Sequence, residues 1–131
     1  MKAMKEQTVH IIDDEEAVRD SLAIFLETVG FPVVSYASAE EFLEASEAGI
    51  DGLILVDARM PGLNGFGLLD ELMMSDLELP VVMISGHGDD EFVERALQKG
   101  AVGFVQKPFT EERLLEAIRQ GLSGTGEESG E

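Results

Sequence analysis

The chain has 131 residues, of which 44% are apolar and 27% charged, the length and composition of one folded domain. It carries 9 Lys and Arg against 27 Asp and Glu, and this net charge of −18 disfavours direct binding to nucleic-acid phosphates. Without cysteine the chain has neither disulfides nor thiolate metal sites, and without an apolar run of roughly 18 to 20 residues it has no membrane span, so we expect a cytoplasmic protein.

Five strand-helix units follow one another along the chain. Short β-branched or continuously apolar runs predict the strands, and apolar residues at helical spacing predict the helices. The predicted strands are residues 8–12, 31–36, 52–57, 81–84 and 101–105. The predicted helices are residues 18–29, 38–49, 66–73, 90–100 and about 110–122.

Local signals support several of these boundaries. Gly30 ends the first helix, and Ser38 and Glu41 have the spacing of a capping box at the start of the second, which Gly49 ends. Strict alternation of strands and helices indicates an α/β fold, a single parallel sheet with helices on both faces. Residues 123–131 have no apolar member and are rich in Gly, Ser and Glu, which is typical of a flexible acidic tail or a linker stub.

Chemically active residues follow four of the five predicted strands. In open α/β sheets, ligands bind at the carboxyl ends of the strands. Asp13 and Asp14 follow the first strand, Asp57 ends the third, Ser85 follows the fourth and Lys107 lies just after the fifth. The sequence therefore places three carboxylates, a hydroxyl and an ammonium group on one rim of the sheet.

These residue types suit Mg²⁺ and a phosphoryl group. Mg²⁺ prefers one or two carboxylates, waters and phosphate oxygens, and its charge would stabilise Asp13 and Asp14 as anions. Asp57 is a candidate nucleophile that would form an aspartyl phosphate, because Lys107 and the metal offset the repulsion between two anions. The hydroxyl of Ser85 would donate a hydrogen bond to the phosphoryl group and so sense its presence.

The motifs at these strand ends carry a family resemblance. They are "DD" at 13–14, "LVD" ending at 57, "MPG" at 60–62, "SG" at 85–86 and "KPF" at 107–109. In this order they resemble the receiver domains of bacterial two-component response regulators, and "DARMPGLNG" and "GAVGFVQKPF" look most like the nitrogen-fixation regulator subgroup.

The resemblance implies a flavodoxin-like receiver fold, doubly wound, with strand order 2-1-3-4-5 and five helices. The receiver domain would occupy residues 1–122. Members of the subgroup usually carry a helix-turn-helix output domain after the receiver, so residues 123–131 are either the tail of a free-standing receiver or the stub of a linker.

The resemblance also implies roles for the carboxylates. Asp57 would accept a phosphoryl group from the phosphohistidine of a histidine kinase or phosphotransfer protein. The side chains of Asp14 and Asp57 and the backbone carbonyl of Arg59 would coordinate Mg²⁺, and Asp13 would contribute through a water molecule. The domain would be a signalling switch and not an enzyme.

Other residues would detect and transmit the modification. Lys107 would pair with the phosphoryl group, Ser85 would move toward it, and Phe104 would swing inward behind Ser85. The peptide bond from Lys107 to Pro108 would be cis. The face made by the fourth helix, fifth strand and fifth helix would change conformation and serve as the contact surface of a homodimer.

Simpler interpretations stand beside these roles. Asp13 and Asp14 also suit the start of the first helix, where acidic residues are favoured. Lys107 taken alone is an ordinary surface lysine, and Phe104 taken alone an ordinary core aromatic. His87, alone between glycines, is more typical of a solvated loop than of a metal or acid-base site.

Two other functions remain open from the sequence. One is a Mg²⁺-dependent phosphatase that works through an aspartyl phosphate, which is disfavoured because such enzymes place an acid/base aspartate where this chain has Arg59. The other is a phosphate-independent binding module with a receiver-like fold, against which the complete set of Asp57, Ser85 and Lys107 argues.

Overall fold

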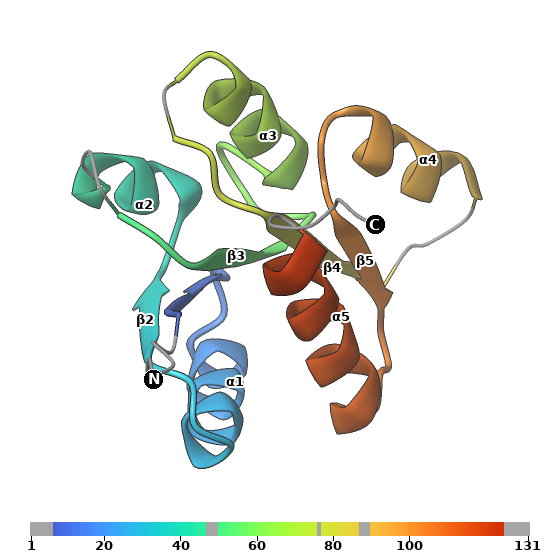
Figure 1. Cartoon of the computed structure of the whole chain (residues 1–131). Coiled ribbons are helices and arrows are strands. Elements are labelled where there is room, and N and C mark those ends of the chain that lie inside the picture. The colour runs from blue at the N-terminus through green and yellow to red at the C-terminus, as the bar shows by residue number, and fades with distance from the viewer. Residues whose placement is uncertain (1–6, 47–49, 76, 87–89, 125–131) are drawn as a thin grey trace.

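The five strands form one parallel sheet. The computed structural model describes residues 7–46, 50–75, 77–86 and 90–124. The strands lie in the order β2-β1-β3-β4-β5, which confirms the predicted order (Figure 1). Their bounds are Val9–Ile12 for β1, Val33–Tyr36 for β2, Leu53–Asp57 for β3, Val81–Ser85 for β4 and Gly103–Gln106 for β5.

Five helices cover the two faces of this sheet. Helices α1 and α5 lie on one face, and α2, α3 and α4 lie on the other (Figure 1). Their bounds are Glu16–Thr28 for α1, Ala39–Ala45 for α2, Gly65–Met73 for α3, Asp90–Gln98 for α4 and Glu111–Gly124 for α5. Within the described part of the chain, no helix has the length and apolar character needed to cross a bilayer.

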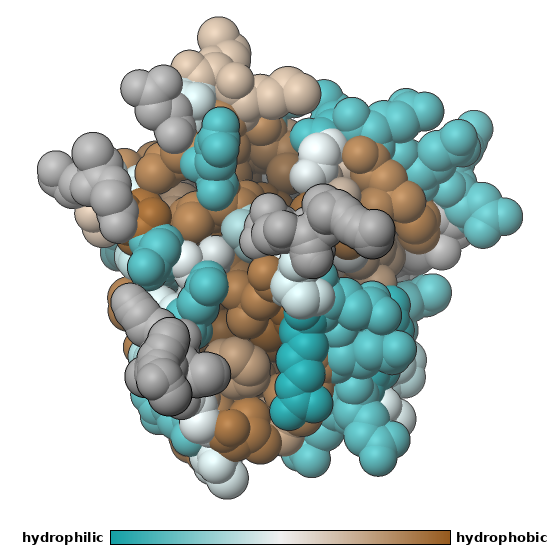
Figure 2. Space-filling model, viewed as in Figure 1, coloured by the Kyte–Doolittle hydropathy of each residue, from teal (hydrophilic) through white to brown (hydrophobic). Residues whose placement is uncertain are grey.

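The core has two halves because successive strand residues point to opposite faces. In β1, Ile12 packs with α2 and α3, whereas Val9 and Ile11 pack with α1 and α5. Strands β3 and β4 each supply residues to both halves of the core, which explains their continuous apolar runs. In the view of Figure 2, hydrophilic side chains gather over α4 and the outer side of α5, and apolar side chains fill the space between helices.

Several helix ends differ from the sequence prediction by one to four residues, and α4, for example, ends at Gln98 and not at Gly100. Helix α2 ends at Ala45 and not at Gly49, because Ser46 is extended and donates its hydroxyl to the Leu43 carbonyl. Gly49 itself lies outside the described residues. Helix α5 continues to Gly124, so Ser123 and Gly124 belong to the helix, and residues 125–131 of the predicted tail lie outside the described residues.

Parallel pairing brings the carboxyl ends of the strands to one rim. Ile12 of β1 pairs with Val56 of β3, and Asp57 pairs with Ile84 of β4. Asp57 at the end of β3 is therefore a neighbour of Asp13, which follows β1, and of Ser85, which ends β4. In the chain, Asp13 lies 44 positions before Asp57 and Ser85 lies 28 positions after it. This rim is where the sequence places its polar residues.

Candidate functional site

Asp57 lies at the centre of the rim, and its two carboxylate oxygens have different partners. One oxygen, Oδ1, accepts a hydrogen bond from the backbone N–H of Arg59 at 2.9 Å. The other, Oδ2, lies 3.3 Å from the Lys107 ammonium nitrogen. The Asp57 side chain is 12% exposed, so it is reachable but largely shielded from water. Shielding strengthens its attraction to Lys107 compared with a surface pair.

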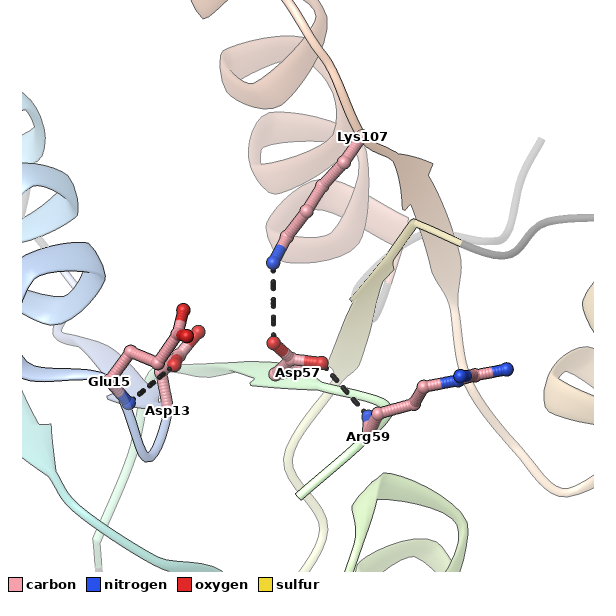
Figure 3. Close-up of polar contacts among 5 residues, drawn as sticks. All are labelled: Asp13, Glu15, Asp57, Arg59 and Lys107. Atoms are coloured by element: carbon pink, nitrogen blue, oxygen red, sulfur yellow. Dashed lines mark hydrogen bonds and ion pairs between the residues drawn. The ribbon is translucent and has the colours of Figure 1, made fainter.

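Lys107 reaches Asp57 from the end of β5, the edge strand two positions away from β3 in the sheet. It follows β5, and its backbone N–H donates to the Ser85 carbonyl at 2.8 Å, which extends the pairing of β4 with β5 by one residue. The peptide bond from Lys107 to Pro108 is cis, as the resemblance implies. Figure 3 shows the Lys107 side chain pointing straight at the Asp57 carboxylate.

Asp13 is the buried member of the aspartate pair. It is 4% exposed, its Oδ1 accepts the Glu15 N–H at 2.9 Å, and its carboxylate faces the space beside Asp57 (Figure 3). Burial raises the pKa of Asp13 from 3.8 to about 6, and the charges of Asp57 and Asp14 add to the rise against the opposing effect of Lys107. The negative charges of Asp57 and Asp14 therefore act on Asp13, and the Lys107 ammonium opposes them only in part.

The start of α1 tests the simpler interpretation that Asp13 and Asp14 cap this helix. The residue before the helix is Glu15, and its side chain makes no capping hydrogen bond. Asp13 accepts the Glu15 N–H just ahead of the helix, so it organises the turn into α1 without capping it. Arg19, which sequence reasoning did not single out, donates to the Asp13 carbonyl oxygen at 2.8 Å and fixes the same turn.

The donor set fits Mg²⁺. Across residues 7–46, 50–75, 77–86 and 90–124, no three His, Cys, Asp or Glu side chains form a cluster that would hold a metal alone. Mg²⁺ does not need one, because it takes one or two carboxylates together with carbonyl oxygens and waters. Asp57 carries a carboxylate at the rim, Asp14 is exposed and follows Asp13 in the chain, and Arg59 follows Asp57 by two residues, with its side chain directed away from Asp13 (Figure 3).

Ser85 and Phe104 occupy different positions relative to this cluster. Ser85 is the last residue of β4 and is 1% exposed, next along the chain to Ile84, the partner of Asp57. Phe104 lies in β5 and packs edge-on against Phe92 of α4, with ring centroids 5.7 Å apart. The structure thus places Ser85 on the rim and Phe104 at the contact of β5 with α4. His87 lies outside the described residues.

One contact near the site was not expected from the sequence. Glu40 of α2 accepts a hydrogen bond from the backbone N–H of Leu63, in the loop between β3 and α3, at 3.1 Å. No sequence signal could have revealed it, because the two residues are 23 positions apart and belong to different elements.

Comparison with known proteins gives consistent matches. The family described as "Response regulator receiver domain" matches residues 9–119. "Transcriptional regulatory protein FixJ" of Azorhizobium caulinodans is 40% identical over 120 residues, which are 92% of this chain and 57% of that protein. The protein of the same name from Rhizobium meliloti is 42% identical over 117 residues, 89% of this chain and 57% of its own length.

Solved structures agree with the sequence matches. The structure titled "Crystal structure of FixJ-N" superposes with a TM-score of 0.84 at 42% identity and covers 90% of this chain and 94% of that one. A Vibrio cholerae chemotaxis protein, CheY4, superposes with a TM-score of 0.79 at 27% identity, over 89% of this chain and 99% of that one. This chain spans little more than half the length of the curated FixJ relatives.

Proposed function

The chain belongs to the response regulator receiver domain family, the signalling domains of two-component systems, and on that premise we propose that Asp57 is the residue that receives the phosphoryl group. One observation carries this assignment. Asp57 is the carboxylate that stands between the Lys107 ammonium on one side and the crowded Asp13 on the other. The donor is the phosphohistidine of a histidine kinase or of a phosphotransfer protein.

Phosphoryl transfer needs a carboxylate oxygen that is held and accessible. The Arg59 N–H holds Oδ1 of Asp57, so the carboxylate cannot rotate freely. As a P–O bond forms to Asp57, the P–N bond of the phosphohistidine breaks and the imidazole nitrogen leaves with the electron pair. The Lys107 ammonium stabilises the negative charge that builds up on the phosphoryl oxygens.

Mg²⁺ is the cofactor that this donor set suits. The side chains of Asp14 and Asp57 and the backbone carbonyl of Arg59 would hold it, and Asp13 would contribute through a water molecule. When bound, the cation supplies positive charge that offsets repulsion between the carboxylates and the incoming phosphoryl group. Burial is the largest cause of the raised pKa of Asp13, and the charges of Asp57 and Asp14 add to it, so a cation beside Asp13 would favour its ionised form.

Ser85 and Phe104 would carry the signal from the site to the surface. The Ser85 hydroxyl would move to donate to a phosphoryl oxygen, and Phe104 would turn inward into the space behind it. Phe104 contacts Phe92 of α4, and its carbonyl accepts from Arg113 of α5 at 3.0 Å, so its motion would disturb both helices.

The surface formed by α4, β5 and α5 is the proposed contact face of a homodimer. A groove of about 440 Å³ opens on the β5 and α5 part of this surface and reaches α4. It is lined by Val93, Phe104, Gln106, Pro108, Phe109, Thr110 and Arg113. Because Phe104 lines this groove, a change in its position would change the shape of the surface.

We propose that the domain acts in the cytoplasm. We also propose that it makes no direct contact with nucleic acid, because its net charge of −18 disfavours binding to phosphates.

Intact-mass spectrometry tests the phosphoacceptor. We expect incubation with Mg²⁺ and acetyl phosphate to add one phosphoryl group to the unsubstituted chain. The adduct should be absent in Asp57→Asn and without Mg²⁺, and present in the control Asp20→Asn, which changes an exposed aspartate of α1. Size-exclusion chromatography of the same samples should show a dimer only after phosphorylation.

Two outcomes would overturn the proposal. An unsubstituted chain that acquires no adduct would be a receiver-like binding module. A chain that releases phosphate over many turnovers without accumulating the adduct would be a phosphatase.

A further inference from the structure

The loop between β3 and α3 contains Arg59, whose carbonyl is a proposed Mg²⁺ ligand, and both ends of this loop are tied. At its start, the Arg59 N–H donates to Asp57. At its base, the Gly65 N–H donates to the Ala58 carbonyl at 3.3 Å, and a β-carbon on Gly65 would lie only 3.0 Å from the Ala58 Cα. Between these two ties, the side chains of Met60 and Leu63 pack against the core, and the backbone of the loop has a further polar contact with α2.

Glu40 of α2 makes this polar contact. Its Oε2 accepts the Leu63 N–H at 3.1 Å, from an element that supplies no residue to the rim. Gly62 is the neighbour of Leu63 and has φ +73°, and a β-carbon there would lie 2.9 Å from the same Oε2. A glycine at this position therefore serves two purposes, since it permits the backbone conformation and lets the carboxylate approach.

Glu40 is itself held in place by the start of α2. The Ser38 hydroxyl accepts the Glu41 N–H at 3.0 Å, as the predicted capping box requires. The Glu41 carboxylate reaches back one residue further than in that motif and accepts the Ala37 N–H at 2.8 Å. Phe42, two residues after Glu40, is fully buried in the core. The helix start is thus fixed on both sides of Glu40, so the backbone from which this exposed carboxylate reaches the loop is held in place.

We propose that Glu40 is a positioning residue, which holds the loop of residues 58–64 in the conformation that directs the Arg59 carbonyl to the metal. The proposal rests on the Mg²⁺ site described under the proposed function. It makes α2 part of the support of that site, although α2 itself lies outside the site. Loss of the carboxylate would free the Leu63 amide and let the loop sample conformations in which the Arg59 carbonyl points elsewhere.

Calorimetric titration with Mg²⁺ tests the role of Glu40. Since one hydrogen bond to a carboxylate is at stake, we expect Glu40→Ala to raise the Mg²⁺ dissociation constant about two- to tenfold. Glu40→Gln keeps an acceptor oxygen and should recover most of the loss. The control is Glu44→Ala, which removes an exposed carboxylate from the same helix and should leave Mg²⁺ affinity unchanged.

A second measurement separates positioning from general stability. In the metal-free protein, the Leu63 amide should exchange with solvent faster in Glu40→Ala than in Glu44→Ala, while urea unfolding of the two variants stays similar. Equal Mg²⁺ affinity in Glu40→Ala and Glu44→Ala would overturn the positioning role and leave the proposed function intact. An unsubstituted chain that binds no Mg²⁺ would overturn both.

Discussion

Adjacent aspartates that look equivalent in the sequence have different surroundings in the fold. Asp13 is 4% exposed and Asp14 is exposed, because the chain turns between the end of β1 and the start of α1. Asp13 therefore bears the cost of burying a charge near Asp57, and its pKa rises to about 6. Lys107 offsets part of this cost, and a bound cation would offset more.

Asp13→Asn tests this cost through its pH dependence. Because the folded pKa is above the unfolded value of 3.8, the folded chain binds more protons between pH 3.8 and about 6. The contribution of Asp13 to the free energy of unfolding therefore falls as pH rises through this window, and the penalty is complete above it. We expect Asp13→Asn to raise the free energy of unfolding of the metal-free chain by about 1 to 3 kcal/mol at neutral pH.

Urea denaturation in the presence of a chelator measures this difference. Asparagine still accepts the Glu15 N–H, so the turn into α1 is kept. The gain over the unsubstituted chain should shrink toward zero as pH falls to the unfolded pKa of Asp13. A gain that is independent of pH, or no gain at neutral pH, would contradict the assignment of the penalty to ionised Asp13.

At the scale of elements, the entry into β3 depends on a glycine. Gly52 has φ +116°, and the next residue, Leu53, donates its N–H to the Thr8 carbonyl at 2.9 Å. A β-carbon on Gly52 would collide with the Thr8 carbonyl oxygen. Gly30, at the end of α1, has a similar φ of +107°, but a β-carbon there would meet no atom within 4 Å. Both glycines therefore have a backbone conformation that strains other residues, but only at Gly52 would a side chain also collide with the neighbouring strand.

Substitution of each glycine by alanine should give unequal losses of stability. Gly30→Ala carries only the strain of a left-handed conformation, which costs about 1 to 2 kcal/mol. Gly52→Ala carries similar strain and also separates β1 from β3 where their pairing begins, so we expect an additional loss of about 2 kcal/mol or more. Urea unfolding at constant pH measures both, and equal losses would show that the strand start relaxes around the added methyl group.

At the scale of the whole molecule, charge opposes folding. The chain has 27 acidic and 9 basic residues, so its net charge of −18 produces self-repulsion that monovalent salt screens. Mg²⁺ would act in two ways, by general screening and by binding among Asp13, Asp14 and Asp57. Only the second effect depends on these particular carboxylates.

Thermal unfolding in MgCl₂ and in NaCl of equal ionic strength separates the two effects. We expect an extra stabilisation by Mg²⁺ of about 2.7 kcal/mol when its concentration is 100 times the dissociation constant. Asp14→Ala should lose most of this extra term, and its metal-free form should be as stable as the unsubstituted chain or more so, because repulsion with Asp13 is relieved. Asp20→Ala, an exposed aspartate of α1, is the control and should keep the extra term. A response to Mg²⁺ that Asp14→Ala leaves unchanged would argue against the site.

The order of strands and helices follows from the amino-acid sequence alone, because the signals for each are local. A continuous apolar run identifies a central strand such as β3, and the spacing of Ser38 and Glu41 identifies the start of α2, which the hydrogen bonds confirm. Once the strands are parallel, Asp57 and Ser85 must end on one rim. The residues of the candidate site follow from this geometry and from the family motifs.

Which of these residues is buried, which is exposed and what supports them depends on how the helices and strands pack together. This packing places Asp13 inside and Asp14 outside, joins Glu40 to Leu63, and ends α2 at Ala45 four residues before the predicted glycine. Each outcome depends on groups that meet across different elements, and burial and hydrogen bonding between such groups exist only after the chain has folded. Local sequence patterns contain no record of these contacts, because the residues involved are far apart along the chain.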